Sequence, residues 1–153
     1  MKKLILLFSV MLIQTAHSAV PQRLSSLPDG DRMVYARLLQ AYRKGNLPEV
    51  IQQRKLMEKH YGNSVFLDRA YYINGLLELQ HDRLGEALKN FDVVTDKFVL
   101  SNKRPSALLA MSTTYKKLNL TKESKAILKK IMKEYPNSPE ARRAWMQLRL
   151  EKQ

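Results

Sequence analysis

The stretch EYPNSPEA, residues 134–141, contains a helix stop and a helix start only a few positions apart. Pro136 lacks a backbone N–H and clashes with the preceding helical turn, so a helix that reaches Tyr135 ends there. Ser138 is a typical N-cap residue, and Pro139 suits the first helical position, where no N–H is needed. The stretch therefore predicts a junction at which one helix ends and another begins at once.

The same punctuation occurs twice more upstream, at an interval of 37 residues. Each copy has an aromatic residue and, three positions later, a serine: Tyr61 and Ser64, Phe98 and Ser101, Tyr135 and Ser138. The same shift aligns apolar positions and turn formers, namely Met57, Val94 and Ile131, and Gly45, Asp82 and Asn119. A fixed interval of about 20 to 50 residues is typical of solenoids, in which each repeat packs only on its neighbours.

Each repeat is interpreted as a pair of helices. Ile127, Leu128 and Ile131 follow the spacing of three and four that marks a helix with one buried face. Turn signals such as KGNLP and LNLT separate the helical segments, and we expect Thr121 to cap the helix after it. The expected helices are residues 31–44, 48–61, 68–80, 84–98, 105–118, 122–135 and 139–151, grouped into repeats 31–64, 68–101 and 105–138 and a capping helix.

Residues 1–19 have the layout of a secretory signal peptide. A basic MKK start is followed by an apolar run at residues 4–13, and TAHSA offers cleavage after Ser18 or Ala19. A membrane anchor is the alternative, but the run is half of the ~20 residues that a spanning helix needs. We therefore expect export, to the periplasm or out of the cell. Residues 20–30, with two Pro, two Ser and one Gly, are interpreted as a flexible tether or as a segment that lies on the first helix.

The chain is strongly basic, with 27 Lys and Arg against 14 Asp and Glu and a net charge of +13. Such a balance favours anionic partners: acidic proteins, lipid head groups, cell-wall polymers or nucleic acid. Nucleic acid is not expected, because an exported protein rarely meets it. The chain has no cysteine, which excludes disulfides, thiolate chemistry and lipid attachment through an N-terminal cysteine.

The helix pairs resemble the tetratricopeptide repeat (TPR) family. The second unit has the small Gly75 with the aromatic Tyr71 four positions earlier, and Ala87 and Phe91 in its second helix. The third unit and the last helix offer Leu108, Ser112, Tyr115, Leu128, Pro136 and Trp145. The resemblance covers about residues 31–151, and the YPNSPEA junction looks like the bacterial cell-envelope subgroup of the family.

The first unit departs from the family pattern at Leu38 and Arg54, where a small residue and an aromatic residue are usual. Terminal repeats are often atypical because one side faces water. The resemblance implies an all-α, right-handed solenoid of antiparallel helix pairs. It also implies that a polypeptide binds along the concave side, which the first helix of each pair lines.

The parts of a catalytic site are missing from this sequence. After the leader, His60 and His81 are 21 residues apart, and no HExxH-type ligand spacing exists. There is no GxSxG turn and no glycine-rich phosphate loop. Asp92 and Asp96 share a helix face, but ion pairs with Lys89 and Lys97 are expected to explain them. We expect no enzyme, metal or cofactor; a cell-wall-associated enzyme or an enzyme activator is the alternative.

Basic and tyrosine residues fall on the face that the resemblance makes concave. Such a groove suits a partner polypeptide with acidic side chains or a free carboxylate. The alternative for Tyr35 and Tyr72 is that they only pack helix against helix. The candidate partner-binding residues are Arg32, Tyr35, Tyr42, Arg43, Arg69, Tyr72, Gln80, Thr113, Lys116 and Lys117. The same face is expected to include Leu39, Leu76, Leu79, Ser106 and Leu109.

A second candidate surface is a lysine stripe on the helix expected at residues 122–135. Lys122, Lys125, Lys129 and Lys133 recur at spacings of three and four. We hypothesise that the stripe contacts anionic lipid head groups or lipopolysaccharide phosphates, although a plain solvated face is the usual fate of such runs. The sequence thus favours an exported, non-catalytic scaffold with an acidic protein partner, and leaves an anionic-lipid or nucleic-acid-binding helical protein as an alternative.

Overall fold

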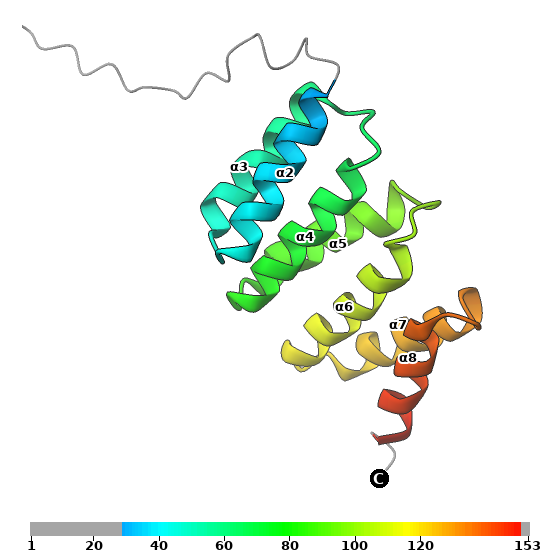
Figure 1. The fold of residues 1–153 in the computed structure, drawn as a ribbon. Coiled ribbons are helices and arrows are strands. Elements are labelled where there is room, and N and C mark those ends of the chain that lie inside the picture. The colour runs from blue at the N-terminus through cyan, green and yellow to red at the C-terminus, as the bar shows by residue number, and fades with distance from the viewer. Residues whose placement is uncertain (1–28, 151–153) are drawn as a thin grey trace, which may run out of the picture.

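The computed structural model describes residues 29–150, which form seven α-helices and no strand (Figure 1). The predicted signal peptide, residues 1–19, lies outside the described residues, as do most of the tether and Glu151. The helices are α2 (Gly30–Arg43), α3 (Leu47–His60), α4 (Leu67–Gln80), α5 (Leu84–Asp96), α6 (Arg104–Lys117), α7 (Thr121–Glu134) and α8 (Pro139–Leu150). The all-α class is confirmed for this part of the chain. None of its helices is long and apolar enough to cross a bilayer.

The helices recur at the interval found in the sequence. α2, α4 and α6 begin at residues 30, 67 and 104 and end at residues 43, 80 and 117, so both ends shift by 37 residues. α3, α5 and α7 begin at residues 47, 84 and 121. α2, α4, α6 and α8 lie side by side in a row, and Figure 1 shows α3, α5 and α7 mostly behind them. The array therefore has two layers, one from each helix of the pairs.

The turn inside each helix pair contains one residue with left-handed backbone. Its φ is 66° at Gly45, 55° at Asp82 and 61° at Asn119. The N–H of each donates to the carbonyl three residues earlier, at 2.9, 3.2 and 3.0 Å. Glycine adopts this conformation without strain, and Asn and Asp tolerate it better than other side chains. The three turn formers that the sequence aligns are confirmed as equivalent turn positions.

The junctions between pairs repeat as well. In each one, the serine N–H donates to the carbonyl of the aromatic residue three positions earlier, at 2.9 Å in all three copies. The bonded pairs are Ser64 with Tyr61, Ser101 with Phe98, and Ser138 with Tyr135. All three aromatic side chains are half-buried. The three aromatic residues thus occupy alike environments.

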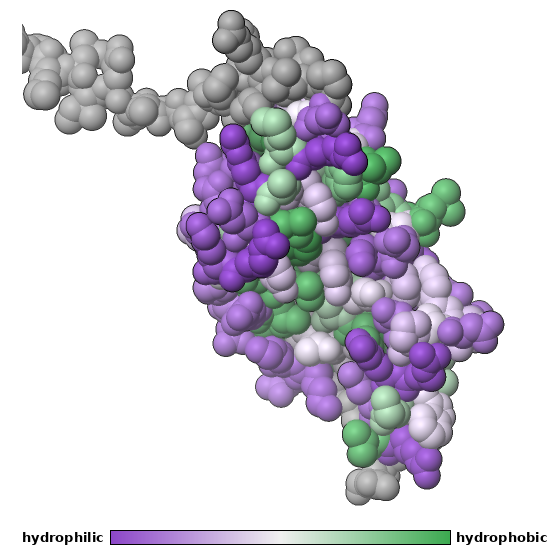
Figure 2. Space-filling view, viewed as in Figure 1, coloured by the Kyte–Doolittle hydropathy of each residue, from purple (hydrophilic) through white to green (hydrophobic). Residues whose placement is uncertain are grey.

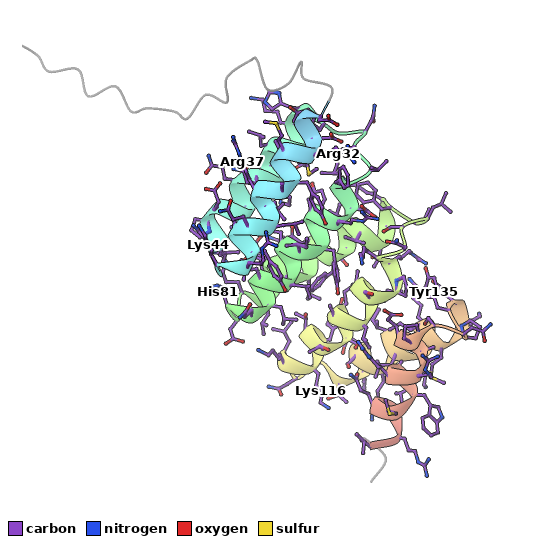
Figure 3. The ribbon with its side chains drawn as sticks, viewed as in Figure 1. Arg32, Arg37, Lys44, His81, Lys116 and Tyr135 are labelled. Carbon is purple, nitrogen blue, oxygen red and sulfur yellow. The ribbon has the colours of Figure 1, made fainter. Side chains whose placement is uncertain are left out.

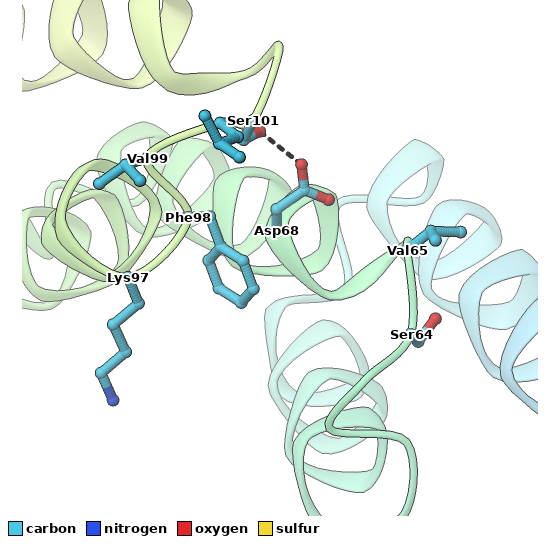
Figure 4. A pocket seen from close by; sticks show the side chains of 8 residues that line it. Ser64, Val65, Asp68, Lys97, Phe98, Val99 and Ser101 are labelled. Atoms are coloured by element: carbon cyan, nitrogen blue, oxygen red, sulfur yellow. Dashed lines mark hydrogen bonds between the residues drawn. The ribbon is translucent and has the colours of Figure 1, made fainter.

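The serine hydroxyls tie successive repeats together. Ser64 Oγ donates to Asp31 Oδ2 at 2.7 Å, and Ser101 Oγ donates to Asp68 Oδ2 (Figure 4). The third copy differs, because proline occupies the position equivalent to these aspartates. There, Ser138 Oγ accepts a hydrogen bond from the Ala141 N–H at 3.0 Å. This confirms the predicted cap of α8.

The predicted cap of α7 and the predicted end of α5 are wrong, whereas the other predicted helix bounds differ from the observed ones by at most one residue. α7 begins at Thr121 itself, whose side chain is not the cap; Leu120 precedes the helix and no side chain caps it. The left-handed residue Asn119 already closes the turn, so the helix starts without a hydroxyl cap. α5 ends at Asp96 rather than at Phe98, because the Phe98 carbonyl accepts the Ser101 N–H of the junction.

The core runs along the whole array. Its fully buried side chains include Val34, Leu38, Val50, Met57, Leu77, Phe91, Val94, Leu108, Leu128 and Ile131. In the second repeat the ring of Phe91 lies against Gly75, so that a Cβ on the glycine would be 2.6 Å from a ring carbon. In the first repeat, Leu38 replaces the glycine and is fully buried. Arg54 replaces the aromatic residue, and its guanidinium lies over the Tyr71 ring, 4.7 Å from the centroid.

Candidate partner-binding surface

A cavity of about 230 Å³ lies between α4, α6 and α8. Its apolar side is formed by Leu76, Leu79 and Leu109, and its polar lining includes Tyr72, Ser106, Thr113, Glu140 and Arg143. Figure 2 views the face formed by α2, α4, α6 and α8, on which apolar surface lies between hydrophilic margins. The cavity thus brings together residues that the sequence assigned to one groove from two separate repeats.

A chain of polar side chains crosses this cavity. Ser106 Oγ donates to Glu140 Oε1 at 2.7 Å, and Tyr72 hydrogen-bonds with Ser106. Burial raises the pKa of Tyr72, and the neighbouring Tyr42 adds to that shift. Tyr72 is therefore a neutral hydroxyl at physiological pH and combines apolar contact area with a polar group.

The first-repeat side of the surface is aromatic. The rings of Tyr35 and Phe66 stack with their centroids 4.9 Å apart and an interplanar angle of 13°. The Arg69 guanidinium lies 5.9 Å from the centroid of Phe66. Burial raises the pKa of Tyr35, and the charge of Arg69 opposes that shift. Tyr35 therefore packs between helices and is still half-exposed, so packing and surface roles coexist at this residue.

The predicted cations are spread along the surface instead of meeting at one point. Arg32 at the start of α2 and Lys116 at the end of α6 lie far apart in Figure 3. Arg32 Nη1 is 3.4 Å from Asp29 Oδ1, and Lys117 Nζ is 2.6 Å from Asp82 Oδ1. The remaining predicted polar residues, Arg43, Gln80 and Thr113, are exposed, and Tyr42 is half-buried.

The sequence prediction missed the contribution of α8. Arg143 and Glu140 both line the cavity. Arg143 occupies the same repeat position as Arg32, Arg69 and Ser106, so extending the register by one more interval would have found it. Glu140 has no such signal, and its carboxylate makes this part of the surface mixed in charge.

The lysine stripe lies on α7, away from its core residues. Lys122, Lys129 and Lys133 are exposed and Lys125 is half-buried. The buried residues of that helix are Ser124, Leu128 and Ile131. The stripe is therefore separate from the cavity between α4, α6 and α8.

The residues considered for chemistry are placed at the surface. His60 and His81 are exposed, and no group of three or more His, Asp or Glu within residues 29–150 is placed to hold a metal ion. The expected pairing of Lys89 with Asp92 is wrong, because Lys89 Nζ is bonded to Glu86 Oε1 at 2.8 Å. Burial raises the pKa of Asp92, and the charge of Asp96 raises it further.

No protein-family model matches the chain, and comparison with curated proteins gives no significant match. The TPR resemblance therefore stays a prediction from the residues quoted above. The functional proposal rests on the cavity, its lining and the distribution of charge on this chain.

Proposed function

We propose that the protein is an exported, non-catalytic adaptor of the TPR type. In this proposal the helix pairs are antiparallel and stack into a right-handed solenoid, whose concave side is the face of α2, α4, α6 and α8. That face holds a partner polypeptide of the cell envelope. The observation that carries the proposal is the cavity of about 230 Å³ on this face, which is lined by both leucine and polar side chains.

The cavity suits one anchoring side chain of an extended polypeptide. Leu76, Leu79 and Leu109 would contact an apolar side chain, and the hydroxyls of Tyr72 and Thr113 would bond backbone groups beside it. Arg143 at the same cavity would pair with a carboxylate through two parallel hydrogen bonds. Burial of an apolar anchor surrounded by such polar contacts is the usual basis of affinity in peptide grooves.

The spread of cations along the face favours an extended acidic segment over a single carboxylate. Arg32, Arg69 and Arg143 stand at equivalent repeat positions, one per repeat except at Ser106. A partner with carboxylates at matching intervals would meet them in turn. Because the array is already ordered, binding costs the receptor little conformational entropy.

A pull-down from cell-envelope extract tests this function. The groove variant replaces Arg32, Arg43, Arg69, Lys116 and Lys117 with glutamine. The matched control replaces Lys122, Lys125, Lys129, Lys130 and Lys133 of α7 with glutamine, which removes the same charge from another surface. The groove variant should lose the partner that the wild type and the control retain; equal recovery by all three proteins would contradict the proposal.

Contact with an anionic membrane surface is the second candidate, favoured by the exposure of Lys122, Lys129 and Lys133 on α7. Binding would be electrostatic and sensitive to salt. Titration of the protein onto anionic and neutral vesicles separates it from the first candidate. Membrane contact is supported if the protein prefers anionic vesicles and the lysine-to-glutamine variant of α7 loses that preference. Equal, weak binding to both kinds of vesicle would contradict it.

Export is part of the proposal and rests on the sequence of residues 1–19. If the leader is removed as its small residues predict, the protein recovered from the periplasm begins at Ala19 or Val20. N-terminal sequencing of that fraction checks this directly. Recovery of the full chain with Met1 from the cytoplasm would contradict it.

A further inference from the structure

α8 occupies the place of the first helix of a fourth repeat, but no second helix packs on it among residues 29–150. The 37-residue shift aligns Trp145 with Val34, Tyr71 and Leu108. These three side chains are 1%, 6% and 1% exposed, whereas Trp145 is 49% exposed. The position that is buried in every complete repeat is thus open in the last one.

The open face of α8 is apolar and hollow. Met146 and Leu150 of the same helix are also exposed. A cavity of about 540 Å³ lies there, lined by Met132, Pro136, Ala141, Arg142, Trp145 and Met146. Large exposed apolar residues gathered at one place are typical of interaction sites rather than of free surface.

The other end of the array is finished differently. Arg37 and Gln40 of α2 point outward and are exposed, whereas the residues at the equivalent positions of α4 and α6 are buried under the preceding repeat. Lys44 lies just beyond them, and Figure 3 shows Arg37 and Lys44 along this edge. A polar outer face is what a terminal repeat needs for solubility. The end at α8 lacks that feature.

The rim of the open face is positively charged. Arg142 lines the cavity, and the Arg149 guanidinium lies 5.2 Å from the centroid of the Trp145 ring. Both arginines are exposed. A second copy of the chain would bring like charges together across this face. A partner with carboxylates beside an apolar stripe complements it.

In the third repeat, an arginine of the first helix also meets a carboxylate of the second helix, although at a different repeat position from Arg142 and Arg149. Arg104, the first residue of α6, donates through Nη1 to Glu134 Oε2 at 2.7 Å and to the Tyr135 hydroxyl. Both acceptors lie at the end of α7, the second helix of that pair. In repeat three, α7 therefore supplies both an apolar face and the carboxylate that pairs with Arg104.

We propose that α8 binds an amphipathic helix of a partner protein in the place that the second helix occupies in each of the three complete repeats. The apolar stripe of that helix covers Trp145 and Met146, and carboxylates flanking the stripe pair with Arg142 and Arg149. This surface is separate from the cavity between α4, α6 and α8, so the two binding events can be measured independently.

Trp145 is the only tryptophan of the chain, so its fluorescence reports on this face alone. The probe is a synthetic amphipathic helical peptide with a leucine stripe flanked by glutamates; the control peptide has the same stripe flanked by lysines. The acidic peptide should shift the emission to the blue and saturate, with affinity about tenfold above that of the lysine peptide. No saturable shift, or equal affinity for both peptides, would overturn the proposal.

Paired variants locate the binding. Arg142→Gln with Arg149→Gln should weaken the acidic peptide about tenfold, whereas Arg37→Gln with Lys44→Gln, at the opposite end of the array and outside both proposed binding surfaces, removes the same charge and should leave its affinity unchanged. All four sites are at least half-exposed, and circular dichroism confirms that the variants fold. Equal weakening by both pairs, or a blue shift of the protein alone as its concentration rises and it dimerises, would overturn the assignment to a foreign acidic helix.

Discussion

Phe91 occupies the space that a side chain at position 75 would need: a Cβ on Gly75 would lie 2.6 Å from Phe91 Cε1. The ring is fully buried. Gly75→Ala should therefore lower the free energy of unfolding by about 1 to 3 kcal/mol through overpacking, although alanine is the better helix former by about 1 kcal/mol. Urea unfolding measures the difference.

Gly85 is the matched control for that substitution, because nothing lies within 4 Å of a Cβ built there. Gly85→Ala should leave stability unchanged or raise it by up to about 1 kcal/mol. In the double variant Gly75→Ala with Phe91→Leu, the smaller side chain relieves the clash. The double variant should therefore lose less unfolding free energy than the two single variants lose together. Additive costs would contradict the contact.

The serine–aspartate bonds between repeats should contribute measurably to stability. Ser101→Ala removes the bond to Asp68 and should cost about 0.5 to 1.5 kcal/mol, and Ser64→Ala should do the same to the bond with Asp31. A double-mutant cycle of Ser101→Ala with Asp68→Ala isolates the interaction. A coupling free energy near zero would mean that the hydroxyl bond adds nothing.

The equivalent turn positions should differ in their response to alanine. Gly45→Ala introduces a Cβ into the left-handed region, which costs about 1 to 2 kcal/mol. Asn119 already has a Cβ in that region, so Asn119→Ala should cost less, and Asn119→Gly relieves the strain and should be close to neutral or stabilising. Thermal unfolding of the three variants compares the positions; tolerance of alanine at Gly45 would contradict the turn geometry.

Stability should fall at high pH because of Tyr71. Burial, with a hydrogen bond to Glu58, raises its pKa to about 12, against about 10 in an unfolded chain. The folded state holds the phenolic proton more tightly, so the free energy of unfolding is undiminished below about pH 10 and falls as the pH approaches about 12. Tyr71→Phe should flatten this slope in urea titrations; an unchanged slope would show that Tyr71 does not contribute.

The repeat made most of the helical layout predictable, because every repeat must present the same faces to its neighbours. Side chains whose contacts depend on the angle between helices were not predictable in this way. Phe66 lies in a junction, outside the periodic apolar positions, so its stacking on Tyr35 left no trace in the pattern. The Lys117–Asp82 pair likewise depends on how the end of α6 meets the turn after α4.

The first repeat illustrates a limit of family patterns. Leu38 and Arg54 both break the expected residue types, and each is accommodated in its own way. Leu38 is fully buried at the glycine position, and Arg54 turns its guanidinium onto the Tyr71 ring of the next repeat. A pattern that treats each position separately cannot anticipate how such departures are accommodated.

The most direct test of the proposed function is site-specific photo-crosslinking in the intact cell. A photoreactive amino acid at Thr113, which lines the cavity and is exposed, should form an adduct with one envelope polypeptide that mass spectrometry can identify. The same group at Lys129 on α7 serves as the control and should give no such adduct. Crosslinks to that polypeptide from Lys129 and none from Thr113 would contradict the claim that the face of α2, α4, α6 and α8 holds the partner.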